Sequence, residues 1–316
     1  MVAYFLRRLM LAVLLVYTVS SASLVLVRLA PGDYVTTELP PGTRPEVVEQ
    51  MRARLGLNRS LSEQYRDWLV HAVRLDFGRS LLYGSPVSDL IRDAAANTAV
   101  LAATALAVAT FIGLPFGIVS GSRSGLLSNA IRAVSVVLLS LPPLLTSLVL
   151  LVVAARTGWF PVGDMRSAGS VASPAGDLLW HLAVPATALA LPIAAMFERL
   201  QSQAMADVVG QPYVLAALAR GIPRSRIVWR DALKPAVRPA VAVYGLVVAT
   251  LLSGSFAVET VTAWPGLGQL MLNALRARDL YLVAGCAAAG SLFLAFGTLC
   301  SDMALALVDP RAGEAG

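Results

Sequence analysis

Long apolar runs constrain this chain more than any other feature of its sequence. About 20 predominantly apolar residues suffice for a helix to cross a bilayer. The runs cover approximately Leu9–Val27, Thr98–Val119, Ile131–Ala154, His181–Phe197, Pro239–Val258 and Tyr281–Val308. Because a segment in lipid must satisfy its own backbone hydrogen bonds, these runs predict an all-α polytopic membrane protein with six transmembrane helices.

The composition supports a membrane protein and argues against nucleic acid as a partner. The chain is 57% hydrophobic and 14% charged, whereas soluble domains have roughly 25% charged residues. Its net charge of +6 comes from basic residues in loops beside the apolar runs, and no nucleic-acid motif is present. We therefore expect the excess positive charge to face membrane lipid.

The runs divide the chain into predicted parts. These are an N-terminal cytoplasmic end with the first span (1–30), an external segment (31–97), a five-helix core (98–308) that includes a cytoplasmic loop (199–238), and a cytoplasmic tail (309–316). In the external segment, the sequence predicts amphipathic helices from Pro45 to Gly56 and after Ser60, where Ser60-Leu61-Ser62-Glu63 is a capping-box pattern.

Several residues within the runs break the apolar pattern. We expect Gly113, Pro115 and Gly117 to break the second span, and the third contains Pro142-Pro143. Among acidic residues, Asp302 lies inside a predicted span, where we interpret it as a hydrogen-bonding partner of a neighbouring helix. The sequence places Glu198 and Glu259 near span ends.

Basic residues in the short loops predict the orientation. They precede the first span, lie between the second and third and between the fourth and fifth, and follow the sixth: Arg7, Arg8, Arg123, Arg199, Arg220, Arg224, Arg226, Arg230, Lys234, Arg238 and Arg311. With six spans, all of these regions fall on one side of the membrane. The positive-inside rule then predicts that both termini are cytoplasmic.

The stretch from Asp207 to Pro239 is polar and basic, and it predicts one short helix. Pro212 suits the first helical position, and Gly221 suits the residue just past the end. A helix of little more than two turns is marginal alone in water, so the membrane surface or a partner protein must hold it. The simpler alternative is an ordinary cytoplasmic loop with some helix in it.

The sequence lacks the motifs of an ATP-hydrolysing or metal-dependent enzyme. The only lysine, Lys234, is followed by Pro235, so the chain has no phosphate-binding loop ending in Gly-Lys-Ser/Thr. The two histidines, His71 and His181, lie outside any metal-ligand pattern, and no nucleophile elbow is present. We therefore expect no catalytic site, cofactor or metal in this chain.

Other motifs give the chain a family resemblance. They are Pro31-Gly32-Asp33, Leu55-Gly56-Leu57, Asp76-Phe77-Gly78-Arg79-Ser80, Glu259-Thr260, Trp264-Pro265-Gly266-Leu267-Gly268 and Asp309-Pro310-Arg311. Together with Ala216, Ala217, Gly221 and Leu233 at the spacing of a cytoplasmic Glu-Ala-Ala-x-x-x-Gly element, they resemble permease subunits of binding-protein-dependent ABC importers. The branch for dipeptides, oligopeptides and nickel complexes is the most similar. Leu215 replaces the motif's Glu, and Tyr34 replaces a second proline of the external motif.

The resemblance implies the type I ABC importer permease fold in a bacterial inner membrane, with the short helix as the contact to an ATPase. The residues it assigns to that contact are Asp207, Gly210, Tyr213, Ala216, Ala217, Arg220 and Gly221. It implies a second permease subunit (usually a different chain), two ATPases that use the ATP, and a soluble solute-binding protein. Di- and oligopeptides are the first expected solutes, with nickel complexes or other small solutes as alternatives.

Two other classes remain open from the residues alone. An ion-driven secondary carrier would need no ATPase, although the predicted spans contain few ionisable residues for such a carrier. An intramembrane enzyme would need a nucleophile and a base within the bilayer, and His181 is the one histidine near a span.

Overall fold

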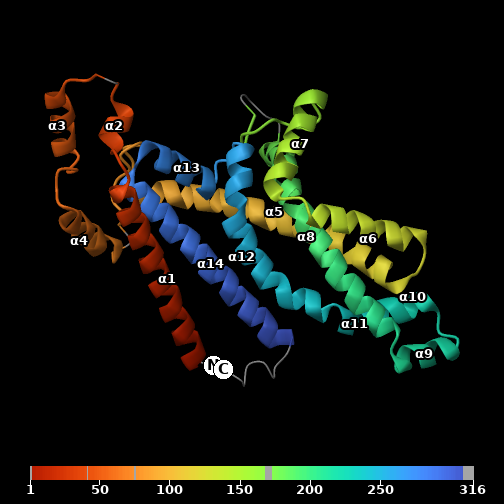
Figure 1. The fold of residues 1–316 in the computed structure, drawn as a ribbon. Coiled ribbons are helices and arrows are strands. Elements are labelled where there is room, and N and C mark those ends of the chain that lie inside the picture. Colours follow the sequence, from red (N-terminus) through yellow and green to blue (C-terminus); the bar gives the residue numbers. More distant parts are fainter. Residues whose placement is uncertain (1, 41, 75, 168–172, 309–316) are drawn as a thin grey trace. The chain divides into compact units, whose positions relative to one another are not determined.

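The structure is a computed structural model that describes residues 2–40, 42–74, 76–167 and 173–308 (Figure 1). The regular structure in these residues is helical, which confirms the predicted all-α class. The chain forms two compact units, one of residues 1–98 and 265–295 and the other of residues 99–264 and 296–316. The predicted tail (309–316) and the Asp302 side chain lie outside what is described.

Within the part of the chain that the structure describes, four helices are long and apolar enough to cross a membrane: α1 (Val2–Leu29), α5 (Val87–Ser122), α8 (Pro174–Val209) and α14 (Leu280–Val308). Two bent helix pairs also pass this test when each pair is taken together. One is α6 (Leu126–Leu139) with α7 (Pro143–Thr157), and the other joins Arg224–Ala236 to the first part of α12 (Arg238–Val261). The predicted six spans are obtained if each bent pair counts as one.

The first unit contains α1, the helices of the segment 31–97 and most of α14. Its short helices are α2 (Tyr34–Glu38), α3 (Pro45–Arg54), α4 (Leu61–Ala72) and α13 (Leu267–Ala277). The predicted capping box is present at the start of α4, where the Ser60 and Glu63 side chains each accept a backbone amide of the other. Trp68 of α4 packs with Leu24 of α1 and Leu280 of α14, which explains the apolar stripe on that helix.

The sequence predicts no helix between the fifth and sixth spans, but the structure has α13 there. Its buried residues Leu267, Leu270, Ala274 and Ala277 recur at helical spacing. Asp279 then ends this region with three hydrogen bonds. It accepts the Ser80 hydroxyl at 2.6 Å, the Leu82 amide at 3.0 Å and the Leu282 amide at 3.2 Å.

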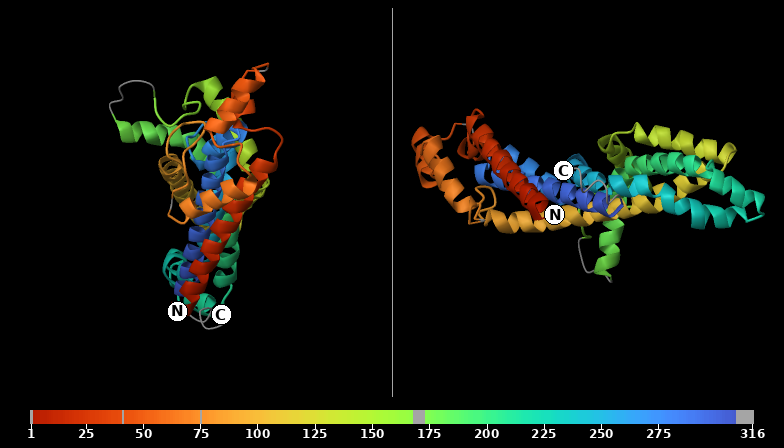
Figure 2. Two further views of the ribbon diagram at one scale, coloured as in Figure 1. Left: turned by 90° about the vertical axis from the view of Figure 1, so that its left-hand side faces the viewer. Right: turned by 90° about the horizontal axis from the view of Figure 1, so that it is seen from below.

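The second unit is built around α8, which packs against α5, α6, α7 and α12. The right-hand view in Figure 2 shows α6 and α8 side by side. Much of the core is alanine, and small residues let neighbouring backbones approach closely. One aromatic pair, Phe197 of α8 and Tyr244 of α12, stacks with ring centroids 4.9 Å apart.

The prediction that glycines break the second span was wrong. Helix α5 is continuous from Val87 to Ser122, with Pro115 inside it. Gly113, Gly117 and Gly121 recur every four residues and face α8. A Cβ added at Gly113 would lie 2.5 Å from the Ala194 carbonyl oxygen, and all three positions would clash in this way. The glycines therefore allow close helix packing, as small residues do in membranes.

The third predicted span, Ile131–Ala154, is not one straight helix. Helices α6 and α7 meet at 103°. Pro142 is extended (φ −62°, ψ 141°) at the N-cap of α7, and Pro143 occupies the first helical position. Proline lacks an amide donor and disfavours the helical region for the residue before it, so the double proline ends one helix and begins another.

Helix α8 extends beyond its predicted bounds of His181–Phe197, from Pro174 to Val209. Part of the predicted cytoplasmic loop is therefore a continuation of this helix. Glu198, placed near a span end from the sequence, lies within α8 and is 2% exposed. Glu259 is also fully buried, near the end of α12.

Candidate functional site

The short helix predicted after Asp207 is present as α9 (Pro212–Ala219) in the second unit. Gln211 is extended at the N-cap, and Pro212 fills the first position, where its missing amide costs no hydrogen bond. Gly221 has φ +79° just past the C-cap residue Arg220. Glycine adopts this left-handed backbone conformation without steric cost.

The end of α9 is closed by a Schellman motif. The Gly221 amide donates to the Leu218 carbonyl at 2.9 Å, and the Ile222 amide donates to the Ala217 carbonyl at 3.2 Å. Ile222 also packs with Ala217 in the same apolar cluster, which is the contact that accompanies this motif. The chain therefore leaves α9 in a defined direction.

The two faces of α9 differ sharply. Val214 and Ala217 are buried against Ile227. Tyr213 is 49% exposed and Leu215 is 54% exposed, and Ala216 lies between them and Arg220 on the open side. The helix is thus fixed on one side and leaves an aromatic, an aliphatic and a small residue uncovered on the other.

The structure separates the residues assigned to this site. Tyr213, Ala216 and Arg220 share the exposed side of α9, and Asp207 is exposed near the end of α8. Ala217 faces inward, so it contributes to the packing beneath α9. Gly210 ends α8 with an ordinary helical φ of −79°, and a Cβ there would meet only ordinary contacts.

The segment after α9 attaches it to the long helices of the same unit. It consists of α10 (Arg224–Arg226), the π-helix η1 (Ile227–Ala232) and α11 (Leu233–Ala236). Ile227 packs under α9, while Val228 and Ala232 pack with Ile118 of α5 and Met205 of α8. One π-helical turn therefore contacts α9 on one side and the ends of two spans on the other, and such turns are frequent at functional sites.

Sequence reasoning missed several residues here. Leu215, Leu218 and Trp229 are large, apolar and exposed in this polar segment. Leu215 and Leu218 belong to the uncharged run Pro212–Ala219, and Trp229 precedes Arg230. An apolar run within this basic segment was a signal that could have identified them. Arg224 was considered as one of the basic loop residues that predict the orientation, but its guanidinium donates to the Ser122 carbonyl of α5 at 2.6 Å.

The arrangement suits a docking surface better than a reaction site. Among the described residues, no group of three or more His, Cys, Asp or Glu side chains could hold a metal ion. The surface of α9 offers instead an exposed tyrosine, a residue type enriched in protein interfaces, beside small and aliphatic residues.

Comparison with known families identifies the kind of protein that has this architecture. The model of the binding-protein-dependent transport system inner membrane component matches residues 113–314, and the model of its N-terminal region matches residues 1–102. The chain belongs to this family. It is therefore a permease component of a binding-protein-dependent importer, which confirms the resemblance seen in the sequence.

Relatives of this permease match along its whole length. The oligopeptide transport system permease protein AppB of Bacillus subtilis is 31% identical over 314 residues, which cover 98% of this chain and 99% of the relative. A Brucella suis protein whose name describes a peptide permease is 33% identical over 316 residues, with the same coverage. The family is that of an inner-membrane component with several apolar helices, as predicted.

Proposed function

We propose that this permease forms a pathway for di- or oligopeptides and is driven by a separate ATPase that docks on α9. The observation that supports docking most directly is the asymmetry of α9, which is packed through Val214 and Ala217 and exposed at Tyr213 and Leu215. Adjacent exposed apolar side chains on an anchored helix are a common mark of a protein-binding surface.

In this proposal the docking residues have distinct roles. Tyr213 and Ala216 contact the ATPase, and Arg220 and Asp207 lie at the edge of the contact. Ala217 and Gly221 position α9, through packing and through the left-handed turn respectively. Gly210 ends α8 immediately before the docking helix.

The remaining components follow from the family. We propose two ATPase subunits, a second permease of different sequence, and a soluble binding protein that delivers solute to the external segment. The ATPases bind the ATP, and this chain has neither a cofactor nor an enzymatic activity of its own. Both termini are cytoplasmic, because the basic residues of the loops then lie inside.

The proposed solute class rests on the relatives. Two that match over the full length have names that specify oligopeptides or peptides. Nickel complexes and other small solutes of the same branch are the alternative. Selectivity is expected to reside largely in the binding protein.

The proposal is tested by replacing Ala216 with tryptophan and purifying the chain in mild detergent. Because the new ring would lift any partner from the exposed side of α9, we expect the amount of retained ATPase to fall at least tenfold. Ala53→Trp is the matched control, since Ala53 is exposed on the external helix α3. It should leave ATPase retention unchanged.

Two results would overturn the docking assignment. One is full ATPase retention by the Ala216→Trp chain. The other is a wild-type chain that purifies without any ATPase in several detergents, together with uptake that survives ATP depletion but collapses with an ionophore. The second result would favour an ion-driven carrier.

A further inference from the structure

The cytoplasm-facing end of α5 in the second unit is a meeting point for polar groups from three other elements. Arg132 of α6 donates to the Ser120 carbonyl at 2.6 Å, and Arg224 of α10 donates to the Ser122 carbonyl at 2.6 Å. The last carbonyls of a helix lack intrahelical partners and carry partial negative charge, so cations bind well there.

Ser120 also makes a contact to α8. Its hydroxyl donates to Oε1 of Glu198 at 2.5 Å, and both residues are almost completely buried. Within the described part of the chain, the second carboxylate oxygen of Glu198, Oε2, has no hydrogen-bond partner. A half-satisfied carboxylate inside a membrane-spanning helix is costly, and such residues usually have a functional role.

A cation lies within the same cluster. The Arg132 guanidinium, besides its bond to the Ser120 carbonyl, reaches the hydroxyl of Ser202, one turn after Glu198 on α8 (3.4 Å). Arg132 and Glu198 therefore share Ser120 as a partner. No ion pair within 4.0 Å joins the two among the residues that the structure describes.

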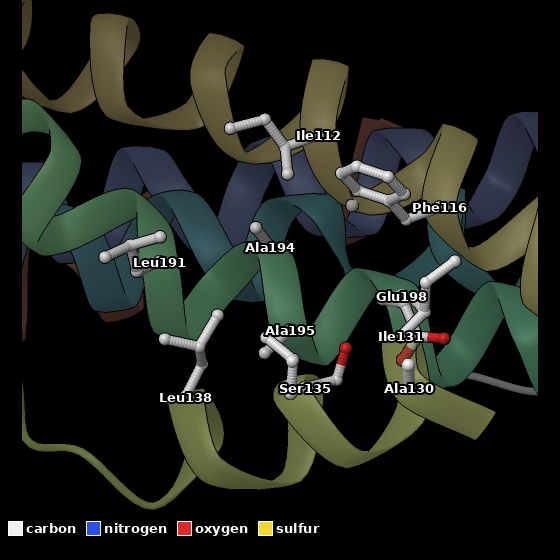
Figure 3. A pocket seen from close by; sticks show the side chains of 12 residues that line it. Ile112, Phe116, Ala130, Ile131, Ser135, Leu138, Leu191, Ala194, Ala195 and Glu198 are labelled. Atoms are coloured by element: carbon white, nitrogen blue, oxygen red, sulfur yellow. The ribbon is translucent and has the colours of Figure 1, made fainter. Parts of the chain in front are cut away.

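Glu198 also borders a cavity. A pocket of about 300 Å³ lies between α5, α6 and α8, and Glu198 forms part of its wall. Figure 3 shows the carboxylate beside Ala130 and Ile131 of α6 at one end of this pocket. The other lining side chains labelled there are apolar except for Ser135.

We propose that Glu198 exchanges its hydrogen bond with Ser120 for a direct ion pair with Arg132 during the transport cycle. The exchange makes Glu198 and Arg132 positioning residues that link the docking segment to the spans. It rests on the proposed function, because the displacement that drives it enters through α9.

The path from α9 to this cluster is continuous. Movement of α9 is passed to η1 through Val214, Ala217 and Ile227, and η1 packs on the ends of α5 and α8. Arg224 ties the same segment to Ser122. When the end of α5 shifts against α8, Ser120 leaves Glu198, and Arg132 is the cation placed to replace it. Two alternative arrangements of one polar group are the kind of bistable element that switching needs.

The test measures this exchange in the complete importer without reference to its solute. Spin labels are attached to cysteines introduced at two exposed positions, Ala133 of α6 and Gln203 of α8, after Cys286 and Cys300 are replaced by alanine. The distance distribution is compared between the nucleotide-free importer and the importer trapped with ATP and vanadate. We expect two distributions, one for each arrangement.

The variants should act in opposite directions. Glu198→Gln and Arg132→Gln each remove the ion pair, so each should lower the population of the trapped arrangement at least fivefold. The double variant should be no worse than either single variant. Ser120→Ala removes only the competing hydroxyl, so it should raise that population. If the cluster had only a structural role, all three variants would change the population of the trapped arrangement in the same direction.

Any of three results would overturn the proposed exchange. The first is a wild-type distance distribution that does not change with nucleotide. The second is a Glu198→Gln distribution equal to that of the wild type, and the third is additive losses in the double variant. Retention of the ATPase during purification separates these failures from failure of the proposed function, since Glu198 lies away from the exposed side of α9.

Discussion

Helices α9 and α13 are both short, and they use their apolar residues differently. Both end at a left-handed residue, Gly221 after α9 and Arg278 after α13. Helix α13 buries Leu267 and Leu270 inside the first unit. Helix α9, in the second unit, buries only Val214 and Ala217 and leaves its larger side chains exposed.

The difference indicates which short helix has its apolar side chains buried by the chain itself. Around α13 the polar groups are also satisfied, because Asp279 accepts three hydrogen bonds and the Leu267 amide donates to the Thr98 hydroxyl at 2.8 Å. In α9 the C-terminal backbone groups are hydrogen-bonded, but the side chains on the outer face are exposed. A helix that is well anchored and still exposes leucine and tyrosine is expected to bind a partner.

The largest expected effect is at Asp279. Replacing it with alanine would leave the buried Ser80 hydroxyl and two amides without an acceptor, so we expect a loss on the order of 3 kcal/mol in the stability of the first unit. Thermal unfolding of the purified chain measures this loss. Asp279→Asn keeps one acceptor oxygen and should lose less. Equal stability of the alanine variant and the wild type would show that α13 is no better anchored than α9.

Matched leucine substitutions sharpen the comparison. Leu270→Ala in α13 removes a buried side chain and should cost about 2–3 kcal/mol. Leu215→Ala in α9 removes an exposed one and should change stability by less than about 0.5 kcal/mol, while weakening ATPase retention during purification. If Leu215→Ala instead destabilised the chain and left ATPase retention unchanged, the exposed face of α9 would have a structural role within the chain.

Much of the fold could be predicted from the sequence because long apolar runs and helix caps are local signals. The capping box at Ser60 and the bounds of α9 are examples, since each depends on a few adjacent residues. The glycine stripe of α5 was misinterpreted because its meaning depends on α8, a helix far away in the sequence. Helix propensity alone cannot distinguish a glycine that breaks a helix from one that a neighbouring backbone requires.

The candidate site shows the same division. The position of α9 and the role of Gly221 at its end were predictable from Pro212 and the glycine itself. The inward orientation of Ala217, the bond from Arg224 to Ser122 and the burial of Glu198 were not, because each depends on tertiary contacts with α5, α8 or η1.

A smaller effect is expected at Gly221. Its φ of +79° is strained for a residue with a side chain, so Gly221→Ala should cost about 1 kcal/mol locally and fray the end of α9. Hydrogen exchange of the Ile222 amide, which closes the Schellman motif, would report this fraying. Gly210→Ala is the control, because Gly210 has a normal helical φ and room for a Cβ. Equal exchange in the two variants would contradict the assigned role.

The smallest expected effect is a pH dependence confined to the start of α2 in the first unit. Asp33 accepts a hydrogen bond from Arg52 at 2.6 Å and from the Thr36 amide at 2.9 Å. Burial alone would raise the pKa of Asp33, but these bonds outweigh it and hold the pKa below its ordinary value of 3.8. The stabilisation is therefore fully present above about pH 4 and is lost as the pH falls through the lower folded-state pKa.

Hydrogen exchange in α2 should accordingly accelerate when the pH falls below about 4, after correction for the intrinsic rate. Asp33→Asn should remove this dependence, because its side chain no longer titrates. Helix α9 contains no acidic residue between Pro212 and Ala219, so its exchange should not change over the same pH step. An equal acid response in α9 and α2 would mean that the whole chain loosens together, and the contrast between a helix anchored by a carboxylate and one anchored only by packing would fail.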